Sequence, residues 1–213
     1  MYNEYRFLRS LENIMQKSRE FRSILTIEEY QFLMKQFTDS KSDIQTNHYF
    51  DTSRFSLKAQ DILLKVKERD GQLEMFLKLK KGYQMAEFTH PITHKELDEI
   101  IKTGIIPFPE IVSELSNIIK EQKMMNFLSL STKRNFLSYG SGALFIDESR
   151  YCYPTIIEDG KIIVVIDHEI EYDAKSYEQG INEFINLIKD YNIVYKKADK
   201  KIKRAFNIYK KIH

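Results

Sequence analysis

The chain has 213 residues, of which 42% are hydrophobic and 13% aromatic, so it can form a substantial folded core. Its 33 basic and 31 acidic residues give a formal net charge of +2, which argues against a general nucleic-acid-binding protein, and its single cysteine excludes an intramolecular disulfide. No apolar run reaches the ~20 residues that span a bilayer, and no signal peptide is visible, so we expect a cytosolic protein without a membrane partner.

Two helices are predicted in the N-terminal part. Apolar side chains recur at helical spacing between Tyr5 and Met15. Further on, Thr26 stands before two glutamates, as an N-cap stands before a first helical turn, and this second helix would end near Phe37. The polar stretch 39–46 is interpreted as a loop.

The rest of the chain alternates between extended and helical regions. We expect extended structure over residues 47–88 and 128–172, helices over 93–102, 109–123 and 176–190, and a basic tail at the end. Two glycine-containing stretches inside the second extended region, 140–142 and 158–160, are typical of hairpin turns. Asp51 and Thr52 are expected to end a strand and set a turn. The predicted fold class is α+β, built on a mainly antiparallel sheet.

Three predicted strands carry charge on one face only. Lys65, Lys67 and Arg69 share one face, because side chains alternate along a strand. In the next strand, Lys78 and Lys80 lie opposite a face of apolar residues, and Glu169 and Glu171 do so in a third. Such faces can simply be solvated. If the charged face is concave, however, lysines and carboxylates together suit a polyanion bound with a divalent metal ion.

A set of short motifs occurs in a fixed order along the chain. They are Tyr49-Phe50-Asp51-Thr52, Leu64-Lys65-Val66-Lys67, Phe76-Leu77-Lys78, Glu87, Thr132-Lys133-Arg134, Phe145-Ile146-Asp147, Glu169-Ile170-Glu171-Tyr172 and Lys201-Ile202-Lys203-Arg204. In these motifs the chain resembles the CYTH family of triphosphate tunnel metalloenzymes, and its layout is most similar to the YjbK-like branch. The family contains adenylyl cyclases, thiamine triphosphatases and inorganic triphosphatases.

The resemblance implies a fold, a domain division and an activity. The fold would be a closed antiparallel β-barrel of about eight strands, open as a tunnel, with helices packed on the outside. A helical extension at residues 1–16 would precede a CYTH-like domain at 17–213. The activity would be the hydrolysis of inorganic triphosphate or of a triphosphorylated small molecule, with Mg²⁺ or Mn²⁺ as cofactor. The partner would be that triphosphate, and the oligomeric state stays open.

The resemblance also assigns roles to residues. It places Lys78, Glu87 and Arg134 at the chemistry, and it gives the following residues as triphosphate ligands: Arg22, Lys65, Lys67, Lys78, Arg134, Lys201 and Arg204. The metal ion would be held by Glu20, Glu169, Glu171 and Asp147. Glu87 and Asp147 are alternatively candidates for orienting the basic side chains.

One departure from the family pattern affects the expected activity. The opening motif, E-x-E-x-K in the family, begins here with Ser18, so one carboxylate is missing, and Arg22 stands in place of the lysine. The chain would then be a weakened enzyme or a triphosphate sensor that does not turn over its ligand. A cyclase or a thiamine triphosphatase on the same scaffold remains open, as does an RNA-binding role for the basic tail.

Overall fold

The computed structural model describes residues 19–212, so the helix predicted between Tyr5 and Met15 lies outside the described residues, as does Ser18. The chain divides into two compact units, and each contains three separate stretches of sequence. Among the described residues, the first unit comprises 19–43, 133–149 and 166–200. The second comprises 44–132, 150–165 and 201–212.

One eight-stranded sheet has the hydrogen-bonded order β1-β8-β7-β6-β2-β3-β4-β5. The strands are β1 (Glu20–Leu25), β2 (Lys41–Thr52), β3 (Leu63–Arg69), β4 (Gln72–Lys81), β5 (Gln84–Ile92), β6 (Met124–Tyr139), β7 (Gly142–Glu158) and β8 (Lys161–Asp173). The order ends at β1 on one side and at β5 on the other. The predicted closed barrel is therefore wrong for the described strands, since the sheet is open. Closure depends on strand tilt and stagger, which side-chain alternation does not encode.

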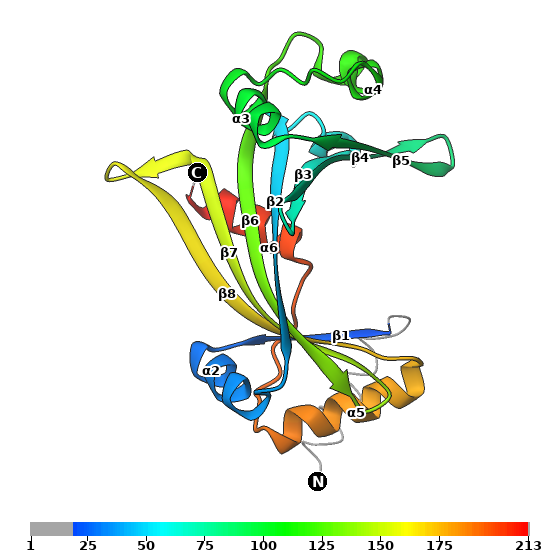
Figure 1. Ribbon diagram of the computed structural model, residues 1–213, viewed down its shortest axis with the longest axis vertical. Helices are drawn as coiled ribbons and strands as arrows, with labels where there is room; N and C mark the ends of the chain where they lie inside the picture. Colours follow the sequence, from blue (N-terminus) through cyan, green and yellow to red (C-terminus); the bar gives the residue numbers. More distant parts are fainter. Residues whose placement is uncertain (1–18, 213) are drawn as a thin grey trace. The chain divides into compact units, whose positions relative to one another are not determined.

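The first unit packs helices α2 (Ile27–Gln36) and α5 (Tyr177–Asp190) against β1 and the adjoining parts of β7 and β8 (Figure 1). Both helices begin where the sequence predicts. Thr26 and Glu29 form a reciprocal capping box at α2, and the Ser176 side chain caps α5. The apolar core between these elements includes Phe21, Leu33 and Phe184. Side chains on the other face of the strands are left free to carry charge.

The second unit contains β2 to β5, parts of β6 to β8, and four helical segments. These are the short 3₁₀ turn η1 (Lys58–Gln60) and the helices α3 (His94–Thr103), α4 (Pro109–Ile119) and α6 (Lys201–Ile212). Helices α3 and α4 cover the apolar face of β3 and β4, where Val66, Met75 and Leu77 are fully buried. A separate apolar cluster joins α6 to β6 and β7. In residues 19–212 no helix has the length and hydropathy needed to cross a membrane.

Most of the predicted elements are confirmed, but three stretches differ. Both glycine-containing turns form the expected hairpins, β6–β7 and β7–β8. The stretch 39–46 is not a loop, because β2 begins at Lys41 and lies between β6 and β3, where backbone pairing does not require apolar side chains. The basic tail is helix α6, whose buried Ala205 and Tyr209 recur at helical spacing. Helix α4 also ends earlier than predicted, at Ile119.

Asp51 has the structural role that its place in the sequence suggests. Its carboxylate accepts hydrogen bonds from the backbone N–H groups of Thr52 (2.7 Å), Leu57 (2.9 Å) and Lys58 (3.0 Å). Burial raises the pKa of Asp51, although these three hydrogen bonds oppose the shift. The carboxylate therefore holds the turn that follows β2.

Replacing Asp51 by alanine should destabilise the fold by about 2 kcal/mol, since three backbone N–H groups, two of them buried, lose their acceptor. Urea unfolding of Asp51→Ala measures this loss, and Asp39→Ala, which changes the same side chain in the exposed 37–40 turn, is the matched control. Equal stability of the two variants would show that the turn does not depend on the carboxylate.

Candidate metal and phosphate site

Three buried carboxylates meet in the first unit. Asp147 comes from β7, and Glu169 and Glu171 come from β8, two residues apart and therefore on one face of the strand. One ligand oxygen from each lies within 4.8 Å of the others. The three residues are 0%, 1% and 7% exposed, respectively. The interpretation of Glu169 and Glu171 as solvated surface acids is therefore wrong.

Two arginines neutralise part of this charge. Arg134 on β6 donates to both oxygens of Asp147, through Nε at 3.0 and 3.2 Å and through Nη2 at 2.7 Å. Its Nη2 also donates to Glu171 Oε2 at 3.2 Å. Arg22 on β1 stands opposite Glu171 in the β1–β8 register and donates to the same Oε2 atom, through Nε at 3.1 Å. Both arginines thus contact the acids directly.

The acids fix the charge of Arg134. Burial disfavours the positive charge, but the hydrogen bonds and negative charges of Asp147 and Glu171 outweigh it and raise the pKa of the guanidinium. The guanidinium carbon also lies 4.4 Å from the centre of the Phe145 ring. Arg134 is therefore a permanently charged group, held on three sides.

The chemistry of this donor set fits a divalent metal ion. Carboxylate oxygens are the ligands that Mg²⁺ and Mn²⁺ prefer, and three buried carboxylates offer ligand oxygens within 4.8 Å of one another. Guanidinium groups at the edge of such a cluster match the geometry of phosphate oxygens. The arrangement can therefore hold a cation and an anion next to each other.

Glu20, the fourth predicted metal ligand, does not join the cluster. Its side chain is 48% exposed and accepts a hydrogen bond from Arg22 Nη2. The group of three carboxylates that lie close together does not include it. In the described residues, β1 thus supplies an arginine to the site and no carboxylate.

In the second unit, Lys65 on β3 is a partly buried member of the predicted phosphate ligands. Its Nζ donates to Asn47 Oδ1 on β2 at 2.9 Å and lies 5.6 Å from the centre of the Phe76 ring. Burial, together with the charge of Lys67, lowers the pKa of Lys65. The lysine is oriented by its neighbours in the absence of any ligand.

The other predicted phosphate ligands of this unit have partners of their own. Lys78 Nζ donates to Glu87 Oε1 at 2.5 Å, across the β4–β5 register, and both side chains are more than a third exposed. Glu87 therefore orients a lysine in this structure. Arg204 in α6 donates from Nε to the Tyr151 hydroxyl at 3.2 Å. Lys201 lies one turn earlier on the same helix.

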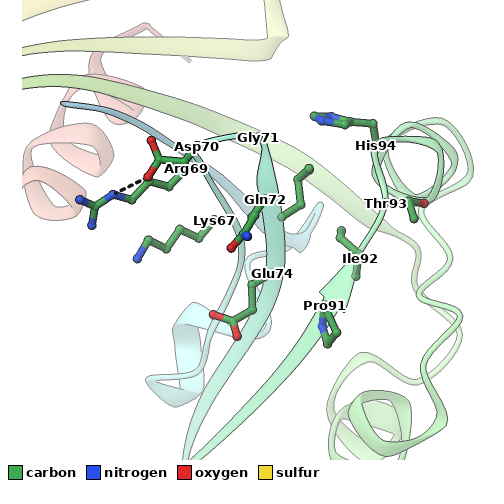
Figure 2. Close-up of a pocket in the computed structure, with 11 residues that line it drawn as sticks. Lys67, Arg69, Asp70, Gly71, Gln72, Glu74, Pro91, Ile92, Thr93 and His94 are labelled. Atoms are coloured by element: carbon green, nitrogen blue, oxygen red, sulfur yellow. Dashed lines mark ion pairs between the residues drawn. The ribbon is translucent and has the colours of Figure 1, made fainter.

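Lys67 lies at the wall of an open cavity of about 840 Å³ (Figure 2). The figure shows Lys67 and Glu74, which are opposite each other in the β3–β4 register, projecting from neighbouring strands. Arg69 and Asp70 form an ion pair at its rim, at 3.7 Å. Because two basic and two acidic side chains line this cavity, it is not a site for phosphate groups alone.

Sequence reasoning missed the partners of the basic residues. Asn47 and Tyr151, which hold Lys65 and Arg204, lie in no motif that the sequence marks out. One pairing, that of Arg134 with Asp147, could have been predicted from the sequence. The β6–β7 turn leaves two residues between Tyr139 and Gly142, and counting outward from it places Arg134 opposite Asp147.

Known proteins resemble this chain in sequence and in fold. Residues 16–206 match the family model described as "CYTH domain". A Bacillus subtilis (strain 168) protein named "Putative triphosphatase YjbK" is 28% identical over 197 residues, covering 88% of this chain and 93% of that protein. Two solved structures share the fold. A "putative adenylate cyclase" from Bacillus halodurans is 24% identical, with a TM-score of 0.59 and coverage of 88% and 96%. HpAC1 from Hippeastrum, described as having a dominant triphosphatase activity, is 17% identical, with a TM-score of 0.57 and coverage of 90% and 94%.

Proposed function

Because the chain belongs to the CYTH domain family, we propose that it is a metal-dependent hydrolase of a triphosphate. The observation that carries the proposal is the buried cluster of Asp147, Glu169 and Glu171 with two arginines hydrogen-bonded to it. The similarity to a B. subtilis protein named as a triphosphatase supports the same reaction class. The substrate is inorganic triphosphate or a small molecule that carries one.

The three carboxylates would hold Mg²⁺ or Mn²⁺, and such an ion stabilises the negative charge that develops on phosphate oxygens during transfer to water. Arg22 and Arg134 would bind those oxygens through their N–H groups, and their planar guanidinium groups allow two parallel hydrogen bonds. Because Arg134 donates to the Asp147 carboxylate through both Nε and Nη2, this arginine is preorganised for an anion. Positioning and charge are the contributions that phosphoryl transfer needs from a protein.

We assign the remaining phosphate contacts, as part of the proposal, to Lys65, Lys67, Lys78, Lys201 and Arg204. Support comes from the preorganisation of two of them by Asn47 and Tyr151. Glu87 would act by orienting Lys78. Single replacement of each basic residue by glutamine should raise KM for triphosphate more than it lowers kcat if these residues bind substrate and transition state alike.

A sensor that binds a triphosphate without hydrolysing it is the second candidate. It is favoured by the opening motif, in which Ser18 replaces the family's first acid, and by Glu20, which lies outside the carboxylate cluster. A sensor would keep metal-dependent binding and lack turnover. Cyclisation of ATP and hydrolysis of thiamine triphosphate are further reactions that the scaffold could support.

Phosphate release tests the proposal. The chain is incubated with inorganic triphosphate, ATP or thiamine triphosphate in Mg²⁺ and then in Mn²⁺, and its melting temperature is recorded with each ligand. We expect turnover that requires the metal ion and falls sharply in Glu169→Gln, which removes one carboxylate of the cluster. Stabilisation by triphosphate without phosphate release would identify a sensor, and the absence of both effects would refute the triphosphate function.

A further inference from the structure

A single oxygen atom of Glu171 is shared by two positive charges. Its Oε2 accepts from Arg22 Nε at 3.1 Å and from Arg134 Nη2 at 3.2 Å. The Glu171 side chain is only 9% exposed, so neither contact is a loose surface ion pair. A carboxylate oxygen has two lone pairs, and two N–H donors use both of them. The arginines and a metal ion therefore compete for this atom.

Charge adds to the competition. A divalent cation bound beside two guanidinium groups is repelled by both, and the repulsion is strong where burial keeps water out. An anionic ligand that draws the guanidinium groups away removes this repulsion. The affinity of Glu171 for a metal ion therefore depends on whether the two guanidinium groups stay beside it.

The two arginines are not equally fixed. Arg134 keeps three hydrogen bonds to Asp147, so only its contact with Glu171 needs to change. Arg22 is bound by Glu171 and by the half-exposed Glu20, and its own side chain is 22% exposed. Arg22 can therefore turn away while its neighbours stay in place.

We propose that Arg22 and Arg134 are internal counter-ions of Glu171 that exchange partners on binding, passing to phosphate oxygens so that Glu171 Oε2 is released to the metal ion. This inference rests on the proposed function for the identity of the anion. By linkage, triphosphate must then tighten metal binding, and the metal ion must tighten triphosphate binding by the same factor. Arg22 and Arg134 are positioning residues for the metal site as well as ligands of the anion.

The test measures Mn²⁺ affinity without any substrate. Arg22→Gln removes one of the two competing charges, so its Mn²⁺ dissociation constant should fall about tenfold relative to the unmodified chain. Arg19→Gln is the matched control, since Arg19 is an exposed arginine three residues away whose Nη1 donates to the Lys175 carbonyl at 3.4 Å. Electron paramagnetic resonance of free Mn²⁺ gives both constants. Equal affinity in the two variants, or weaker binding in Arg22→Gln, would overturn the proposal.

The exchange of arginine partners can be measured in the unmodified chain. Imidotriphosphate, which is not hydrolysed at its bridging nitrogens, should tighten Mn²⁺ binding, and the factor should be smaller in Arg22→Gln, after correction for Mn²⁺ bound by the free anion. With Mg²⁺ and imidotriphosphate, the ¹⁵N–¹H signal of Arg22 Nε should also shift. This measurement does not depend on a variant that folds, and an unchanged signal refutes the exchange. If Mn²⁺ binding behaves as expected while no phosphate is released, the counter-ion exchange stands and the hydrolase proposal fails.

Discussion

Glu169→Gln is expected to lower kcat/KM for triphosphate hydrolysis at least about 100-fold and to weaken Mn²⁺ binding to a similar extent. Glu169 is 1% exposed and belongs to the cluster of three carboxylates. Glutamine has nearly the same shape, but its amide carries no charge and is a poorer metal ligand. The substitution therefore removes the chemistry of one ligand with little change in packing.

A matched control lies on the neighbouring strand. Glu148 follows Asp147 on β7 and so points to the other face, where its carboxylate lies 3.6 Å from His168. Glu148→Gln makes the same change of charge in the same unit and should leave hydrolysis within about twofold of the unmodified chain. Phosphate release and Mn²⁺ titration are measured on both variants. A Glu169→Gln variant that hydrolyses triphosphate at the control's rate would show that the cluster is not the metal site.

Arg134→Met is expected to destabilise the fold by about 3 kcal/mol at pH 8. The Asp147 side chain is fully buried, and this variant leaves it without the arginine that binds both of its oxygens. The buried charge of Asp147 then loses its guanidinium partner, and removing one member of a buried ion pair costs more free energy than removing both.

The double variant Arg134→Met/Asp147→Leu separates charge from packing. It removes the buried pair as a whole, and we expect it to recover most of the stability lost in the single variant. Urea unfolding at pH 8 gives the free energies of unfolding for all three chains. A loss that the second substitution does not recover would mean that Arg134 stabilises the fold through its contact with the Phe145 ring instead.

Much of the site could be predicted because alternation and turn length are local properties of the sequence. The spacing of Glu169 and Glu171 places both on one face of β8, and the two-residue turn between β6 and β7 sets Arg134 against Asp147. Both predictions rest on residues within one strand or one hairpin, where the covalent chain fixes the register.

Contacts between distant strands could not be predicted in the same way. Arg22 and Glu171 are 149 positions apart, and their contact depends on β1 pairing with β8, which no local pattern specifies. Asn47 reaches Lys65 through the pairing of β2 with β3, whose register the sequence does not specify. The open edges at β1 and β5 could not be predicted either, since they depend on the geometry of the whole sheet.

The division of each unit among three stretches of sequence has a consequence for how this protein can change over time. The acid cluster and its arginines draw on all three stretches of the first unit, which begin with Arg22, continue with Arg134 and Asp147, and end with Glu171. No single cut in the chain yields that unit intact. Gene fusion or truncation therefore cannot transfer this unit to another protein by itself. Its specificity must evolve by point substitution in place, and a circular permutation that keeps every strand is a less damaging rearrangement than a deletion.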